Sequence, residues 1–181
     1  MKLKIFGMAI LFAGIIFSGC GEEKDSAPAN KVEAQSLTAK FPQFATTNLA
    51  GETVTNEIFA QKKITVVNIW GTFCPPCIAE MPELGVLAEN LPAGAQLIGI
   101  VCDAQSAADN QTLDAAKKIL AEANANFPNL IPNAELGNFL QNVYAVPTTI
   151  FVDAQGNLIG EPVIGADVES YRQRVKDFLN E

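Results

Sequence analysis

Two cysteines separated by two prolines, Cys74-Pro75-Pro76-Cys77, are the residues in this chain best suited to redox chemistry. They follow the apolar, mostly β-branched run 64–69, so they lie where a buried strand is expected to lead into a helix. At a helix N-terminus, free backbone N–H groups and the positive end of the helix dipole stabilise a thiolate and lower the pKa of a cysteine. The spacing therefore predicts a dithiol/disulfide centre in which Cys74 is nucleophilic near neutral pH.

The same cysteine spacing also occurs in haem attachment sites, zinc sites and structural disulfides. Haem attachment requires a histidine directly after the second cysteine, and Ile78 stands there. A zinc site needs four cysteine or histidine ligands, yet the chain has no histidine and its other cysteines, Cys20 and Cys102, are isolated. A structural disulfide across two residues constrains the unfolded chain little. We therefore expect no metal and no cofactor beyond the redox-active cysteine pair.

The N-terminus has the order of a secretory signal, with Lys2 and Lys4 before the apolar run 5–17 and small residues before Cys20. The apolar run is shorter than the roughly 20 residues of a membrane span. Residues 1–19 resemble a bacterial lipoprotein signal, whose cleavage leaves a lipid on Cys20. The alternative is an uncleaved N-terminal anchor. In either case we expect a membrane-attached protein of the cell envelope that faces the extracytoplasmic side, where disulfides persist.

The residues after Cys20 are small and polar, which indicates a flexible tether over residues 20–40. The remaining segment, 41–181, has the size of one domain, and an apolar fraction of 49% over the whole chain is sufficient for a core. The net charge of −8 disfavours nucleic acid as a partner.

Hydrophobic patterns over 41–181 predict alternating strands and helices followed by a hairpin, which indicates an α/β fold with a mixed sheet and helices on both faces. An N-terminal β-hairpin is expected over 41–54. A second hairpin is expected over 148–164, with 158–164 as its second strand. The other predicted strands are 64–69, 97–102 and 129–131, and the predicted helices are 74–91, 109–123, 135–144 and 167–179.

Two segments of the chain resemble the TlpA/ResA-like thiol-disulfide oxidoreductases of the thioredoxin superfamily. The first, 67–84, includes the cysteine pair, and the second, 144–153, includes Val146-Pro147-Thr148. The two motifs occur in the family's order about seventy residues apart, and the resemblance extends over 41–181. It implies a thioredoxin-like fold, in which a central mixed sheet is flanked by helices and extended by an N-terminal hairpin.

The resemblance also implies roles for individual residues. Cys74 is expected to attack a substrate disulfide, Cys77 to resolve the mixed disulfide, and Pro147 to be cis and to face the pair. In thioredoxin a buried aspartate lies six residues before the first cysteine, whereas this chain has Asn68 there. In this branch of the superfamily a glutamate three residues after the second cysteine takes that part, and here it is Glu80.

Glu80 also has a purely structural interpretation. An acidic residue in the first turns of a helix is favoured by the helix dipole whatever its function. However, Glu80 lies three residues after Cys77 and therefore on the same face of the helix. This placement favours a carboxylate that exchanges a proton with the Cys77 thiol.

The residues expected to contact the substrate surround the cysteine pair: Trp70, Pro75, Pro76, Val146 and Pro147. Trp70 is equally compatible with a place in the core. Cys102, near the end of the predicted strand 97–102, is interpreted as a small buried residue, with a third redox thiol as the alternative.

These features predict a lipid-anchored, outward-facing oxidoreductase that reduces protein disulfides and is recharged by an upstream electron donor in the membrane. One alternative is a non-catalytic lipoprotein that binds a metal or a partner through the same surface. Another is a thiol peroxidase on a related fold. Such enzymes usually carry a proline and a threonine seven and three residues before the first cysteine, where this chain has Val67 and Gly71, so the peroxidase is the less expected alternative.

Overall fold

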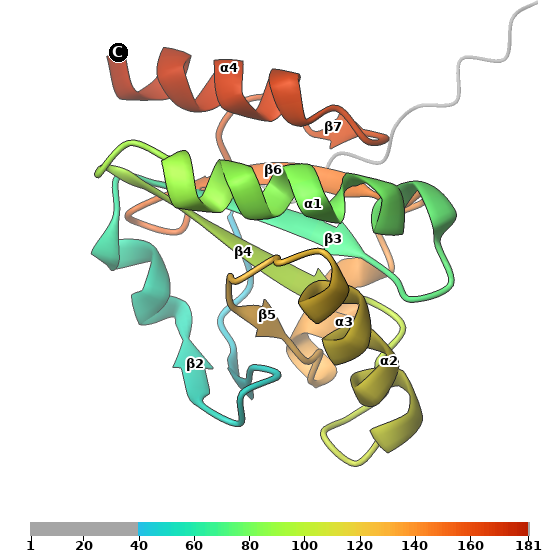
Figure 1. Ribbon diagram of the computed structural model, residues 1–181. Helices are drawn as coiled ribbons and strands as arrows, with labels where there is room; N and C mark the ends of the chain where they lie inside the picture. Colours follow the sequence, from blue (N-terminus) through green and yellow to red (C-terminus); the bar gives the residue numbers. More distant parts are fainter. Residues whose placement is uncertain (1–39, 181) are drawn as a thin grey trace, which may run out of the picture. The chain divides into compact units, whose positions relative to one another are not determined.

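The computed structural model describes residues 40–180, so the predicted signal 1–19, Cys20 and all but the last residue of the predicted tether lie outside the described residues (Figure 1). A five-stranded sheet of order β5-β4-β3-β6-β7 forms the centre. β3 (Ile64–Trp70), β4 (Ala95–Val101) and β5 (Asn129–Leu130) run parallel, whereas β6 (Thr148–Asp153) and β7 (Val163–Ile164) pair antiparallel with their neighbours. The mixed central sheet predicted from the sequence is therefore confirmed.

The N-terminal hairpin is also confirmed, because β1 (Ala45–Thr47) pairs antiparallel with β2 (Thr53–Thr55). Between them, the Asn48 side chain accepts hydrogen bonds from two backbone N–H groups of the turn. The N–H of Ile131 donates to the carbonyl of Thr47 at 2.9 Å, which ties the hairpin to the chain just after β5. A 3-10 helix, η1 (Asn56–Gln61), leads from the hairpin toward β3.

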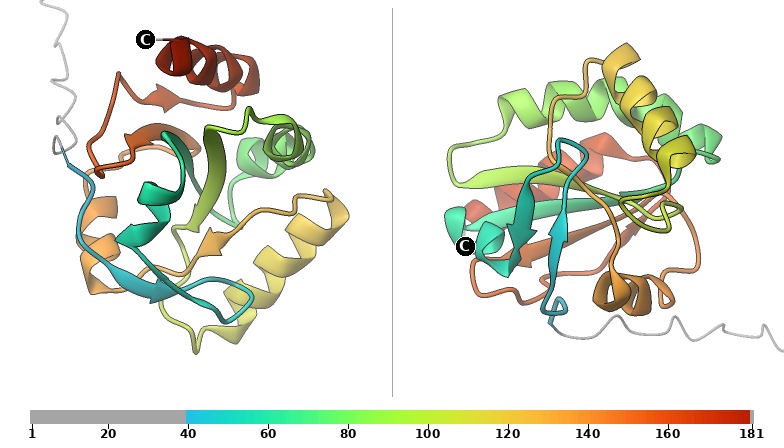
Figure 2. Two further views of the ribbon diagram at one scale, coloured as in Figure 1. Left: turned by 90° about the vertical axis from the view of Figure 1, so that its left-hand side faces the viewer. Right: turned by 90° about the horizontal axis from the view of Figure 1, so that it is seen from below.

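Helices cover both faces of the sheet, as expected (Figures 1 and 2). Side chains of α1 (Pro75–Asn90), α2 (Asn110–Glu122) and α4 (Val168–Asn180) pack on one face, and those of η1 and α3 (Ala134–Leu140) pack on the other. Successive side chains of β3 alternate between the two cores, with Val66 and Trp70 toward the first and Val67 and Ile69 toward the second. This alternation directs Asn68 to the face that carries α1 and α4.

Two segments differ from the prediction. The expected strand 158–164 is interrupted, so that Leu158 makes only an isolated bridge and β7 has two residues. Gly160 adopts φ 65°, and Pro162 has no N–H to donate, so neither residue can continue the ladder. The expected helix 135–144 ends at Leu140, and the chain beyond it forms the loop that approaches the cysteine pair. Within 40–180, no helix combines the length and apolar character needed to cross a membrane.

Candidate active site

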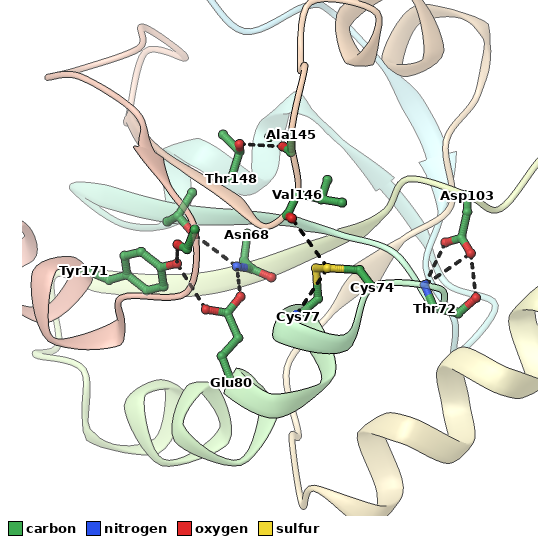
Figure 3. Close-up of a disulfide and its surroundings, with 12 residues drawn as sticks. Asn68, Thr72, Cys74, Cys77, Glu80, Asp103, Ala145, Val146, Thr148 and Tyr171 are labelled. Carbon is green, nitrogen blue, oxygen red and sulfur yellow. Dashed lines mark hydrogen bonds between the residues drawn. A yellow bond between two sulfur atoms is a disulfide. The ribbon is translucent and has the colours of Figure 1, made fainter.

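Cys74 and Cys77 lie at the start of α1 and form a disulfide (Figure 3). β3 ends at Trp70, and four residues later Cys74 caps the helix, with Pro75 in its first position. The Cys74 sulfur accepts a hydrogen bond from the N–H of Cys77 at 3.3 Å. Pro75 and Pro76 have no N–H, so the Cys77 N–H is the first-turn donor at this sulfur. Together with the helix dipole it stabilises negative charge on the sulfur when the disulfide opens.

Asp103 fixes the loop that precedes Cys74. Its carboxylate accepts hydrogen bonds from the Thr72 backbone N–H at 3.1 and 3.2 Å and from the Thr72 hydroxyl at 2.5 Å (Figure 3). Asp103 follows the end of β4, the strand parallel to β3, so the carboxyl ends of two neighbouring strands meet at the site. Sequence reasoning missed Asp103, because only the pairing of the strands brings it to Thr72.

The loop before β6 covers the disulfide. The Val146–Pro147 peptide bond is cis, which confirms the predicted conformation. The carbonyl oxygen of Val146 lies 3.5 Å from the Cys74 sulfur. The loop is held by the N–H of Gly165, which donates to the Pro147 carbonyl at 2.8 Å, and by the hydroxyl of Thr148, which donates to the Ala145 carbonyl at 2.8 Å.

The Cys74 side chain is less exposed than its place at a helix start suggested. It is 4% exposed in the disulfide form, and Cys77 is fully buried. In the oxidised state Cys74 is therefore buried, and the Val146 carbonyl lies 3.5 Å from its sulfur. Of the two cysteines, Cys74 is nevertheless the one that retains some exposure.

Glu80 is buried beneath the cysteine pair, at 4% exposure. One carboxylate oxygen accepts a hydrogen bond from Asn68 Nδ2 at 2.9 Å, and the other lies 3.1 Å from the hydroxyl of Tyr171 (Figure 3). Burial raises the pKa of Glu80 to about 7, although these hydrogen bonds oppose the shift. A helix-start carboxylate placed only by the dipole would lie in solvent, so the dipole alone does not account for the position of Glu80.

Tyr171 of α4 completes this buried network. It is fully buried, and its hydroxyl also contacts the Gly165 carbonyl at 2.8 Å. A buried tyrosine hydroxyl usually has a hydrogen-bond partner, so a tyrosine in the predicted helix 167–179 was the sequence signal for a buried polar contact. The partner could not be identified from the sequence, because Glu80 lies 91 residues earlier in the chain.

The buried carboxyl gives a prediction for stability. Folding raises the pKa of Glu80 from 4.5 to about 7. Between these two pH values the folded chain therefore retains a proton that the unfolded chain releases. The free energy of unfolding should therefore fall as the pH rises from 5 to 8, by about 2–3 kcal/mol relative to the Glu80→Gln variant. Urea unfolding of the oxidised wild-type and Glu80→Gln chains at each pH checks this. The chain has no histidine, so no histidine titrates between pH 5 and 8. A stability difference that is independent of pH would contradict the shift.

Trp70 lies in the core, which agrees with the second of the two interpretations of this residue and not with a place at the substrate surface. It is fully buried, and its indole N–H donates to Asn129 Oδ1 at 2.8 Å. Gly99 on β4 leaves room for this Asn129 amide, since a Cβ there would lie 1.9 Å from Asn129 Oδ1. Trp70 is therefore a core residue that anchors the end of β3.

The other residues expected at the substrate surface lie around the disulfide. Pro75 and Pro76 are exposed, Val146 is half-buried and Pro147 is buried. Large apolar side chains are also exposed nearby, with Phe73 directly before Cys74 at 67% and Ile78 directly after Cys77 at 38%. The surface beside the cysteine pair is thus apolar.

Cys102 does not have the environment of a reactive thiol. It is half-buried at the end of β4, and burial together with the neighbouring Asp103 raises its pKa to about 11. A thiolate is therefore scarce there at neutral pH, which argues against a third redox thiol. Among residues 40–180, no three acidic, cysteine or histidine side chains are grouped as metal ligands.

Comparison with known proteins places this geometry in a family. A family model described as AhpC/TSA matches residues 37–160. The chain belongs to the AhpC/TSA family. Within this family it is similar to the thiol:disulfide interchange protein DsbE of Pseudomonas fluorescens biotype C, with 30% identity over 85% of this chain and 80% of that protein. It is also similar to the thiol-disulfide oxidoreductase ResA of a Bacillus cereus strain, with 28% identity over 83% of this chain and 80% of the relative.

The fold agrees with the same assignment. A thioredoxin-family thiol:disulfide interchange protein from Chlorobium tepidum has a crystal structure that superposes with a TM-score of 0.64 and 22% identity, over 78% of this chain and 96% of that one. This AhpC/TSA family member thus has the predicted thioredoxin-like fold. It is a thiol-disulfide oxidoreductase of the DsbE and ResA type, with Cys74 and Cys77 as its cysteine pair.

Proposed function

We propose that this oxidoreductase reduces protein disulfides on the extracytoplasmic side of a membrane, to which a lipid on Cys20 attaches it. The observation that carries the proposed exchange is the buried Glu80 on the helix of the pair, with a pKa raised to about 7. A carboxylate with that pKa can take the proton of a neighbouring thiol near neutral pH, and reduction requires such an acceptor for Cys77. The reductase direction rests on the family resemblance and is tested by the reduction potential.

The exchange proceeds in two displacements. The Cys74 thiolate attacks a substrate disulfide, which forms a mixed disulfide and releases one substrate thiolate. Cys77 then loses its proton to Glu80 and attacks the Cys74 sulfur, which releases the second substrate thiolate and closes the Cys74–Cys77 disulfide. Two electrons pass to the substrate, so an upstream membrane donor must return two electrons to the pair. No other cofactor is needed.

The surface around Cys74 supports a protein substrate. The Val146 carbonyl lies at the disulfide and can accept a hydrogen bond from an extended substrate segment. Phe73 and Ile78, with the exposed Pro75 and Pro76, can contact apolar side chains that flank the substrate cysteine.

The two alternatives make different predictions. A non-catalytic binding protein would fail to reduce insulin disulfides when supplied as the dithiol, whereas the proposed enzyme reduces them. A thiol peroxidase would consume hydrogen peroxide through Cys74. The residues at positions 67 and 71 disfavour it, because Val67 and Gly71 stand where such enzymes usually carry proline and threonine.

The reduction potential tests the direction of electron flow. Strong oxidants owe their power to a very stable reduced form, and Pro75 and Pro76 bring no positive charge that would stabilise the Cys74 thiolate. We expect a potential nearer the ~−270 mV of thioredoxin than the ~−120 mV of DsbA. Equilibration with glutathione buffers measures it, and a value above about −180 mV would reverse the proposed direction.

The lipid anchor has its own test. Mass spectrometry of the mature chain should find Cys20 as the N-terminal residue, carrying a lipid. A Cys20→Ser variant is expected to leave the membrane fraction while its dithiol still reduces insulin. An N-terminus at Met1 without lipid would contradict this part of the proposal.

A further inference from the structure

Asn68 occupies the centre of the site without a role in the exchange described so far. It lies on β3, is fully buried, and faces α1 and α4. Its Nδ2 group donates to Glu80 Oε1 at 2.9 Å and to Thr149 Oγ1 at 3.0 Å. A carboxamide nitrogen has two hydrogens, so both are committed.

The other end of the carboxamide is unsatisfied. Asn68 Oδ1 is buried and has no hydrogen-bond partner among the residues that the structure describes. Buried acceptors are rarely left unpaired, because the loss of water costs free energy that no new bond returns. In Figure 3 the carboxamide extends toward the disulfide, whose sulfurs have no hydrogen to donate.

Reduction supplies the missing donor. When the disulfide takes up two electrons and two protons, it becomes two thiols. The Cys74 sulfur already lies beside an acceptor, the Val146 carbonyl at 3.5 Å. Cys77 is fully buried and lies one helical turn from Glu80, to which Asn68 is bonded.

We propose that Asn68 is a positioning residue for Cys77, whose S–H donates to Asn68 Oδ1 in the dithiol. One carboxamide then holds the thiol on its oxygen and the Glu80 carboxylate on its nitrogen, so the thiol and the group that takes its proton are positioned by the same side chain. This inference rests on the proposed dithiol exchange and adds a hydrogen bond that exists only in the reduced state.

The first test is the equilibrium with glutathione. Asn68→Leu removes the acceptor at similar volume, so the dithiol loses a hydrogen bond and the disulfide loses an unpaired oxygen. The equilibrium constant for reduction should fall roughly three- to tenfold, which corresponds to about 14–30 mV for two electrons. The measurement is made at pH 5.5, below the pKa of Glu80 of about 7, so that this carboxyl stays protonated. An unchanged constant would overturn the proposal.

Tyr171→Phe is the matched control. It removes the contact at the other carboxylate oxygen of Glu80 and leaves Asn68 in place. The proposal requires an unchanged equilibrium constant for this variant at pH 5.5. An equal fall in both variants would assign the effect to Glu80 and overturn the role of Asn68.

The second test observes the hydrogen bond directly and does not depend on turnover. In a Cys74→Ser chain, Cys77 is a permanent thiol, and its infrared S–H band is isolated by subtracting the spectrum of the Cys74→Ser/Cys77→Ser chain. The band should shift to higher wavenumber when Asn68→Leu is added, and Tyr171→Phe should leave it in place. A band that Asn68→Leu does not move would overturn the proposal, whereas a wild-type pair that fails to exchange with glutathione would refute the proposed function instead.

Discussion

Replacement of Cys74 by alanine is expected to abolish disulfide exchange, whereas Cys77→Ser should stop the reaction at the mixed disulfide. Cys74 lies at the helix start, its sulfur accepts a hydrogen bond from the Cys77 N–H, and it retains some exposure, so it is the attacking group. Cys77 is fully buried and can reach only the Cys74 sulfur, so its loss leaves the substrate attached. Insulin reduction and non-reducing electrophoresis of the trapped adducts measure the two outcomes.

Cys102→Ser is the matched control for these variants, because it removes a thiol from the same strand-end region without touching the pair. Its activity should equal that of the wild-type chain, since burial raises the pKa of Cys102 to about 11. Adducts that form on Cys77 in the Cys74→Ala chain, and none in the Cys77→Ser chain, would reverse the assignment of the two roles. The proteins captured by Cys77→Ser in cells would identify the physiological substrates.

Glu80→Gln should lower the rate of substrate reduction by about 10²-fold at pH 8, the lower end of what a positioned base contributes. With a pKa of about 7, Glu80 is ionised at pH 8 and can accept the Cys77 proton, whereas at pH 6 it is protonated and cannot. The wild-type rate should therefore rise through pH 7, and the variant should lose that rise. Single-turnover reduction of a disulfide peptide between pH 5.5 and 8.5 measures the profile.

Glu83→Gln provides the control, because Glu83 lies on the same helix but is exposed. The Glu83 charge is the smallest of the causes that shift the pKa of Glu80, and it raises it, so Glu83→Gln should keep the rise in the pH–rate profile and move its inflection only slightly to lower pH. Tyr171→Phe removes one hydrogen bond from the Glu80 carboxylate and should move the inflection to higher pH, since that bond lowers the pKa of Glu80. A pH profile that Glu80→Gln leaves unchanged would reduce Glu80 to a buried structural residue.

The cysteine pair, its place between a strand and a helix, and the cis Val146–Pro147 bond could all be inferred from the sequence. The pair and its place depend on a short motif and on local hydrophobic periodicity, so nearby residues are sufficient to define them. The mixed sheet was inferred for the same reason. The cis bond was implied by the family resemblance of residues 144–153. Where the local pattern was weak, as at Gly160 and Pro162, the predicted strand was too long.

The environment of the pair was decided only by the tertiary structure. Tyr171 reaches Glu80 across 91 residues of sequence, and Asp103 reaches Thr72 across 31. Trp70 is buried because β5 brings Asn129 to its indole N–H, which no pattern around the cysteines could reveal. Burial and hydrogen-bond partners depend on contacts between distant segments, and these raise the pKa of Glu80 to about 7. The sequence by itself therefore identified the cysteine pair, whereas the packing of β3, α1 and α4 decided the pKa of Glu80 on the same helix.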